Sequence, residues 1–144
     1  MYQEVILDHY KSPRGKGLRE PFTGQSHQVN PTCGDEITVR VKLSEDKNII
    51  EDISYEGVGC SISQAAMSIL FEQVLGKNVS EFDEISKEFL AMMQSKGIYE
   101  PNEDLLGDGI AMIGVAQYPA RIKCALLSWM GVKDAIIRSK GENK

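Results

Sequence analysis

The chain has 144 residues and a formal net charge of −5 at pH 7, with 42% hydrophobic and 26% charged residues. This length is close to the commonest size of a single domain and allows enough apolar burial to fold without disulfides. The acidic balance argues against nucleic acid as a partner, because phosphate binding needs a basic face. No segment approaches the run of about 18 apolar residues that a membrane span requires. We therefore expect one domain over residues 1–144 that binds neither nucleic acid nor membrane.

The start of the chain and its cysteine content indicate a compartment. The first ten residues carry two acidic residues and no basic region ahead of an apolar one, which argues against a secretory signal. Three cysteines cannot all pair within the chain, so free thiols or metal ligation are the favoured interpretations. We expect a cytoplasmic protein.

The first part of the chain predicts one helix followed by an antiparallel pair of strands. Apolar and aromatic residues recur at helical spacing over residues 2–10, and the polar stretch over 26–29 only weakly favours a strand. Apolar and polar residues alternate over 37–43, which is the clearest strand in the sequence. Residues 44–48 are typical of a hairpin loop, and 49–55 are expected to form the returning antiparallel strand.

Helical periodicity replaces this alternation in the next part of the chain. An apolar stripe over 62–74 predicts a helix, and Ser61 with Gln64 has the form of a capping box at its start. Ser80 is expected to cap a further helix that continues to about Ser95.

The last part of the chain predicts a long final helix. An acidic connector over 100–104 and a short apolar stretch over 110–115 precede Pro119, where proline suits a first helical turn. That helix is expected to end at about Ser139, and residues 141–144 to form a frayed tail.

Two of the three cysteines occur where a chain commonly presents reactive groups. Cys33 lies in a predicted loop, where Gly34 lets the backbone approach a ligand closely and Asp35 can direct a carboxylate at the same point. Cys60 comes just before the helix expected from residue 62, where unpaired amides and the helix dipole favour a thiolate. A packing role does not explain either position.

Cys124 is expected to lie off the packed face of the last helix. At 100° per residue, the apolar residues of this helix cluster within an arc of about 140°, with Cys124 roughly opposite. The residues of that stripe are Ile122, Ala125, Leu126, Trp129, Met130, Ile136 and Ile137. A packing cysteine would lie on the stripe, so we interpret Cys124 as a site residue.

The three cysteines are interpreted as one metal-binding site. Separations of 27 and 64 residues match no short zinc-finger spacing, so their contexts carry this hypothesis. Thiolates select zinc, copper(I) or iron–sulfur chemistry, and Asp35 can complete a four-ligand tetrahedron, unless it only caps its own turn. His9 and His27 are other possible ligands, but His9 lies on the apolar side of a predicted helix and His27 stands alone in a loop. Structural roles are favoured for both histidines.

Four motifs, spread over nearly the whole chain, carry a family resemblance. They are Tyr2, Val5-Ile6, Asp8-His9-Tyr10-Lys11 and Pro13-Arg14; Asn30-Pro31 with Cys33-Gly34-Asp35; Gly57 with Gly59-Cys60-Ser61-Ile62-Ser63; and Arg121 with Lys123-Cys124-Ala125, Leu127 and Trp129. With these motifs the chain resembles the SufU-type proteins of iron–sulfur cluster assembly, a branch of the IscU/NifU-like scaffold family. The resemblance implies a single α+β domain, in which a three-stranded antiparallel sheet packs against about five helices. It also implies that the three cysteines converge at one exposed end.

The resemblance further implies a site and a partner. Zinc would be held by Cys33, Asp35, Cys60 and Cys124, with Cys33 as the sulfur acceptor and Arg121 stabilising the thiolates or the sulfur in transit. The implied partner is a pyridoxal-phosphate-dependent cysteine desulfurase of the SufS type, which hands over persulfide sulfur. A downstream scaffold or apo-proteins would receive that sulfur.

Two features separate the chain from the IscU branch. In that branch a histidine immediately precedes the third cysteine, where this chain has Lys123, and the second and third cysteines are closer together. The additional length lies around residues 99–117, and both features resemble the SufU branch.

Three functions follow from the same four residues. The leading hypothesis is zinc-dependent sulfur transfer, in which the Cys33 thiolate attacks the outer sulfur of the desulfurase persulfide. The second is a scaffold that binds iron or a nascent [2Fe–2S] cluster and hands it on, against which Lys123 counts. The third is a zinc ion that only braces the fold, which predicts collapse on chelation and no sulfur on any cysteine.

Overall fold

A three-stranded antiparallel sheet forms one layer of the protein. The computed structural model describes residues 2–31, 34–94 and 106–141. The strands lie in the order β1–β2–β3, with bounds β1 Gly24–Asn30, β2 Asp35–Leu43 and β3 Ile50–Val58. Asn30 pairs with Asp35, and Glu36 pairs with Val58. The end of β1, the start of β2 and the end of β3 therefore meet at one end of the sheet.

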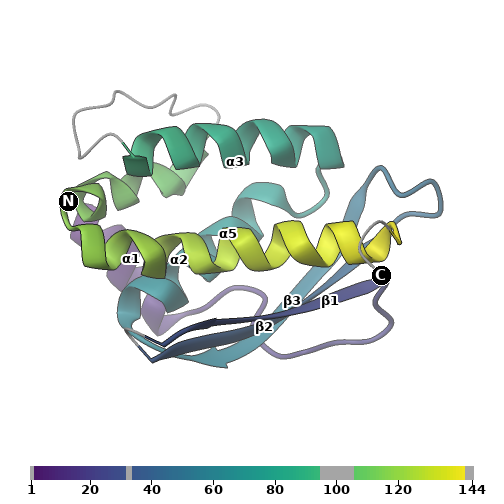
Figure 1. Ribbon diagram of the computed structural model, residues 1–144, viewed down its shortest axis with the longest axis horizontal. Coiled ribbons are helices and arrows are strands. Elements are labelled where there is room, and N and C mark those ends of the chain that lie inside the picture. Colours follow the sequence, from purple (N-terminus) through teal and green to yellow (C-terminus); the bar gives the residue numbers. More distant parts are fainter. Residues whose placement is uncertain (1, 32–33, 95–105, 142–144) are drawn as a thin grey trace.

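The helices cover one face of this sheet. They are α1 Tyr2–Lys11, α2 Ser61–Val74, α3 Val79–Gln94, the 3-10 helix η1 Gly107–Gln117 and α5 Pro119–Ser139. Figure 1 shows α5 lying along the sheet, with α3 on the far side of α5 and with α1 and α2 toward one end. The predicted α+β domain with a three-stranded antiparallel sheet is confirmed. The described residues hold four α-helices and one 3-10 helix, where about five helices were expected.

The apolar residues of β2 form the side of the core that the sheet contributes. Ile37, Val39, Val41 and Leu43 are all buried, as their alternation with polar residues predicts. Above α5, the Trp129 ring stacks on Phe89, with ring centroids 4.7 Å apart. Each fully buried side chain of this size contributes about 1.5–3 kcal/mol of transfer free energy, so α3, α5 and the sheet are held together mainly by apolar burial.

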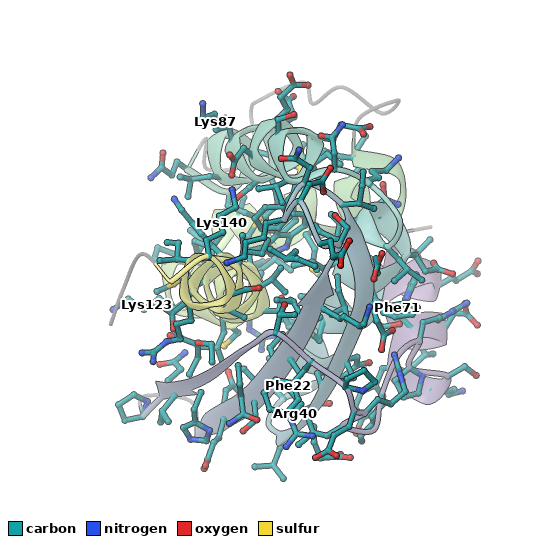
Figure 2. All side chains as sticks on the ribbon, turned by 90° about the vertical axis from the view of Figure 1, so that its right-hand side faces the viewer. Phe22, Arg40, Phe71, Lys87, Lys123 and Lys140 are labelled. Carbon is teal, nitrogen blue, oxygen red and sulfur yellow. The ribbon has the colours of Figure 1, made fainter. Side chains whose placement is uncertain are left out.

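The outward residues of β2 are polar. The Arg40 guanidinium lies 4.3 Å from the centroid of the Phe22 ring, on the side of the sheet away from the helices (Figure 2). Within the described residues, no helix combines the length and apolar character needed to cross a membrane.

The strands agree with the sequence predictions in existence but not in length. The weakly predicted strand over 26–29 is confirmed. β1 extends it in both directions because it pairs with β2, and the polar side chains of β1 give no sequence signal for this pairing. The strand predicted over 49–55 begins at Ile50 and continues to Val58, where Gly57 pairs with Ile37.

Both predicted helix caps were wrong. Cys60, not Ser61, occupies the N-cap of α2 without a side-chain cap, and the Gln64 N–H donates to the Cys60 carbonyl at 3.2 Å. At α3 the capping box is formed by Asn78 and Glu81 instead of Ser80: the Glu81 N–H donates to Asn78 Oδ1 at 2.7 Å, and the Asn78 N–H to Glu81 Oε1 at 3.3 Å. Ser95 and the connector over 100–104 lie outside the described residues.

Candidate metal centre

Asp35, Cys60 and Cys124 come together at one end of the sheet. Asp35 is the first residue of β2, Cys60 is the N-cap of α2, and Cys124 lies in the second turn of α5. One ligand atom from each residue lies within 4.8 Å of the other two. Two thiol sulfurs and a carboxylate oxygen, from three separate elements, therefore converge on one point.

The two oxygens of the Asp35 carboxyl group have different contacts. Its side chain is buried, and Oδ1 accepts a hydrogen bond from the Cys60 backbone N–H at 2.9 Å. Oδ2 lies 4.0 Å from Cys60 Sγ. One oxygen therefore joins β2 to the start of α2, and the other faces the cysteine sulfur.

Gly59 leaves the room that this arrangement needs. A Cβ atom at this position would lie 2.4 Å from Asp35 Oδ1 and 2.7 Å from Ser63 Oγ. Such contacts are too short for any side chain, so only glycine lets the backbone pass this close to the carboxylate.

Cys124 is buried in the core, contrary to the expectation that it faces away from the packed side of its helix. Its side chain is 1% exposed. The buried arc of α5, which packs against the sheet, α2 and α3, is rotated away from the predicted apolar stripe, and Met130 of that stripe is 56% exposed. Small or polar residues such as Gly131 and Ser128 also lie in that buried arc. The sulfur belongs to the core and also to the group of Asp35, Cys60 and Cys124.

The two histidines lie outside the group. His9 is fully buried, with Nδ1 2.7 Å from Ser68 Oγ and Nε2 3.4 Å from the Glu72 carboxylate, so it fastens α1 to α2. His27 lies on β1 instead of in a loop, with Nδ1 2.8 Å from Thr38 Oγ1 and Nε2 2.9 Å from Glu36. These contacts agree with the structural roles favoured from the sequence.

The structure describes one of the two remaining predicted site residues. Cys33 is among the residues that the structure does not describe. Arg121 is exposed and lies three residues before Cys124 on α5. Lys123 is exposed on the outer side of α5 (Figure 2), so it does not point toward the buried Cys124 sulfur.

Two further polar residues contact the cysteines. Asn30 Nδ2 lies 3.9 Å from Cys124 Sγ, and Ser63 Oγ lies 3.9 Å from Cys60 Sγ. Sequence reasoning assigned no role to either residue. Asn30 could have been found, because it is a polar residue at the end of a predicted strand, directly before the Cys33 loop.

The described group fits a tetrahedral metal ion. With Zn–S bonds of about 2.3 Å and Zn–O bonds of about 2.0–2.2 Å, tetrahedral ligand atoms lie roughly 3.5–3.8 Å apart. The 4.0 Å between Cys60 Sγ and Asp35 Oδ2 comes close to this range, and the ligand atoms of all three residues lie within 4.8 Å of one another. Thiolates with one carboxylate suit zinc or an iron–sulfur centre, and three ligands leave a fourth position.

Comparison with known proteins settles the family. The profile of the NifU-like N-terminal domain matches residues 1–125. The chain belongs to this NifU-like family. The match ends within α5, which continues to Ser139, and the extent of the domain over residues 1–144 stays a prediction.

Three relatives of this NifU-like chain cover most of its length. The zinc-dependent sulfurtransferase SufU of Bacillus subtilis is 44% identical and covers 99% of this chain, which spans 94% of that protein. The iron–sulfur cluster assembly scaffold protein IscU of Streptococcus pyogenes is 41% identical over 96% of this chain and 84% of its own. A crystal structure from Fervidobacterium islandicum, assigned as an iron–sulfur cluster assembly scaffold protein for the SUF system, superposes with a TM-score of 0.83 at 36% identity, covering 92% of this chain and 94% of that one. The resemblance drawn from the sequence motifs is confirmed.

Proposed function

We propose that this protein is a zinc-dependent sulfurtransferase of iron–sulfur cluster assembly, which accepts persulfide sulfur from a cysteine desulfurase. The observation that carries the proposal is the convergence of Asp35, Cys60 and Cys124 within 4.8 Å. Cys33, two residues before Asp35, supplies the fourth ligand and the sulfur acceptor. The 44% identity to a zinc-dependent sulfurtransferase supports the assignment of zinc.

The transfer needs a thiolate on Cys33 at neutral pH. A zinc ion bound by these residues would supply it by holding the coordinated thiols deprotonated. The Cys33 thiolate attacks the outer sulfur of the desulfurase persulfide, a new S–S bond forms, and the desulfurase cysteine leaves as a thiolate. The reaction exchanges one persulfide for another, so it needs no oxidant or reductant.

The exposed residues near the group would meet the partner. Arg121 lies one helical turn before Cys124, where its guanidinium can stabilise the negative charge of a thiolate or persulfide. The proposed donor is a pyridoxal-phosphate-dependent cysteine desulfurase of the SufS type, and the proposed acceptors are a downstream scaffold or apo-proteins. We assign this activity to the cytoplasm, because it depends on thiols that stay reduced.

A scaffold for a nascent [2Fe–2S] cluster is the second candidate. It is favoured by the two thiols and one carboxylate of the group, which suit iron as well as zinc, and by the 41% identity to an IscU scaffold. The exposed Lys123 cannot serve as the ligand that a histidine would provide. Anaerobic reconstitution with iron and sulfide distinguishes the two: a stable cluster that passes to an apo-ferredoxin would favour the scaffold.

Desulfurase turnover tests the leading proposal. Cysteine consumption by a SufS-type desulfurase is measured with the zinc-loaded protein and with the Cys33→Ser variant. We expect the wild-type protein to accelerate turnover and Cys33→Ser to abolish the acceleration. His27→Ala, on the exposed face of β1, is the control and should accelerate like the wild type. Equal acceleration by Cys33→Ser would refute the assigned acceptor.

A further inference from the structure

We propose that Asn30 is a positioning residue that donates a hydrogen bond to the Cys124 thiolate and thereby stabilises Cys124 as a ligand of the metal centre. This inference rests on the proposed zinc site but concerns a residue outside its ligand set.

Asn30 occupies a fixed place beside the metal-binding group. It is the last residue of β1 and pairs with the ligand Asp35 across the sheet. Its side chain is 6% exposed, and Nδ2 lies 3.9 Å from Cys124 Sγ. The same strand end therefore positions one ligand through its backbone and contacts another through its side chain.

The chemistry of a buried thiolate explains why an amide lies there. The Cys124 side chain is 1% exposed, so its negative charge would receive little stabilisation from water. A thiolate only accepts hydrogen bonds, whereas the amide nitrogen of asparagine carries two donors. An uncharged donor stabilises the sulfur without competing for the metal.

The sulfur of Cys60 has different surroundings. The nearby Ser63 hydroxyl donates to the Cys60 carbonyl oxygen at 3.0 Å, so its proton is already used. The other neighbour of Cys60 Sγ is Asp35 Oδ2 at 4.0 Å, an acceptor when the carboxylate is ionised. Cys60 is also only half-buried. Of the two cysteines in the described group, Cys124 is thus the one whose sulfur an uncharged side-chain donor contacts.

Substitution of Asn30 by leucine tests this role, because leucine has a similar shape and no donor. We expect zinc affinity, measured by competition with a chromogenic chelator, to fall by about 10-fold or more, the usual loss for an outer-shell partner. In the cobalt(II)-loaded protein, the thiolate-to-metal charge-transfer band should move to lower energy, because an unbonded thiolate is a stronger electron donor. Asn30→Ser, which keeps one donor, should recover part of the affinity.

A residue-specific readout and a control complete the experiment. Alkylation of the zinc-loaded protein, mapped by mass spectrometry, should be faster at Cys124 in Asn30→Leu and unchanged at Cys60. Gln28→Leu, two residues earlier on β1 and bonded to Ser26, is the matched control and should behave as the wild type.

Three outcomes would overturn the inference. An unchanged zinc affinity and charge-transfer band in Asn30→Leu would exclude the hydrogen bond while leaving the proposed function intact. Equal losses in Asn30→Leu and Gln28→Leu would assign the effect to β1 packing. Absence of zinc binding by the wild-type protein would refute the inference together with the proposed function.

Discussion

The Cys60 backbone N–H donates a hydrogen bond to Asp35 Oδ1 at 2.9 Å, and this contact joins the N-cap of α2 to the first residue of β2. Asp35 therefore has a part in folding through one oxygen, while the other faces Cys60 Sγ. Since the two oxygens have different tasks, substitutions at Asp35 can separate stability from metal binding.

Asp35→Asn is expected to keep the fold and lose the metal. The amide oxygen can still accept the Cys60 N–H, so the free energy of unfolding of the metal-free protein should be unchanged or higher, because a buried charge is removed. Zinc affinity should fall by more than the roughly 10–100-fold typical of an outer-shell loss. Asp35→Ala should in addition lose about 1–3 kcal/mol of stability. Urea denaturation and chelator competition measure the two effects, and equal zinc affinity in Asp35→Asn would exclude this carboxylate as a ligand.

Gly59→Ala should disrupt the centre through steric contact. The added Cβ would lie 2.4 Å from Asp35 Oδ1, so the carboxylate must move away from the sulfur of Cys60. We expect weaker zinc binding and lower thermal stability. Gly76→Ala is a matched control, because its φ of +81° makes alanine costly by about 1 kcal/mol while nothing lies within 4 Å of its Cβ. Loss of zinc affinity in both variants alike would contradict this steric explanation.

His9→Ala should destabilise the fold without affecting the metal. The substitution leaves a cavity between α1 and α2 and removes the Ser68 contact, which together cost about 2–4 kcal/mol. Zinc stoichiometry should remain that of the wild type, because His9 lies outside the group of Asp35, Cys60 and Cys124. Calorimetry and metal analysis check both points, and a loss of bound zinc in a folded variant would give His9 a role that its position does not predict.

Tyr55 makes the fold sensitive to alkaline pH. Burial raises the pKa of its phenol from the usual 10.0 to about 12. The raised pKa contributes stability below pH 10, and this contribution is lost as pH rises from 10 to 12, since the unfolded chain releases its proton first. The hydroxyl has no hydrogen-bond partner among the described residues.

Tyr55→Phe is therefore expected to be close to neutral at pH 7 and to unfold less steeply above pH 10. Urea midpoints at pH 7 and pH 11 measure the difference between the two proteins. If Tyr55→Phe lost more stability between pH 7 and pH 11 than the wild type does, the phenol would not be the cause of the alkaline sensitivity.

Sequence patterns predicted those parts of the fold in which one face of an element is buried. The alternation in β2 is regular because only one of its faces meets the helices, and its prediction is confirmed. In α5 the pattern misled, because neighbours on several sides bury Cys124 together with small and polar residues. The cap of α3 was misplaced because Asn78 and Ser80 are both good caps, and only the structure shows that Glu81 returns to Asn78.

The candidate site was predicted by residue type and not by position in space. The contexts of Cys60 and Asp35 pointed to the group, whereas Cys124 was included because it was expected to lie off the packed face of its helix, which its burial contradicts. Their convergence depends on the pairing of β1, β2 and β3 and on the placement of α5, which are long-range contacts that no local pattern encodes. Gly59 was missed for the same reason.

The location of the transferred sulfur tests the central claim most directly. The zinc-loaded protein is incubated with a SufS-type desulfurase and cysteine, alkylated, and mapped by mass spectrometry at all three cysteines. A persulfide on Cys33, absent from Cys60 and Cys124 and absent without desulfurase, is the predicted result. If no cysteine of the zinc-loaded protein gained sulfur, the result would contradict sulfur transfer. The metal centre would then have a scaffold or a structural role.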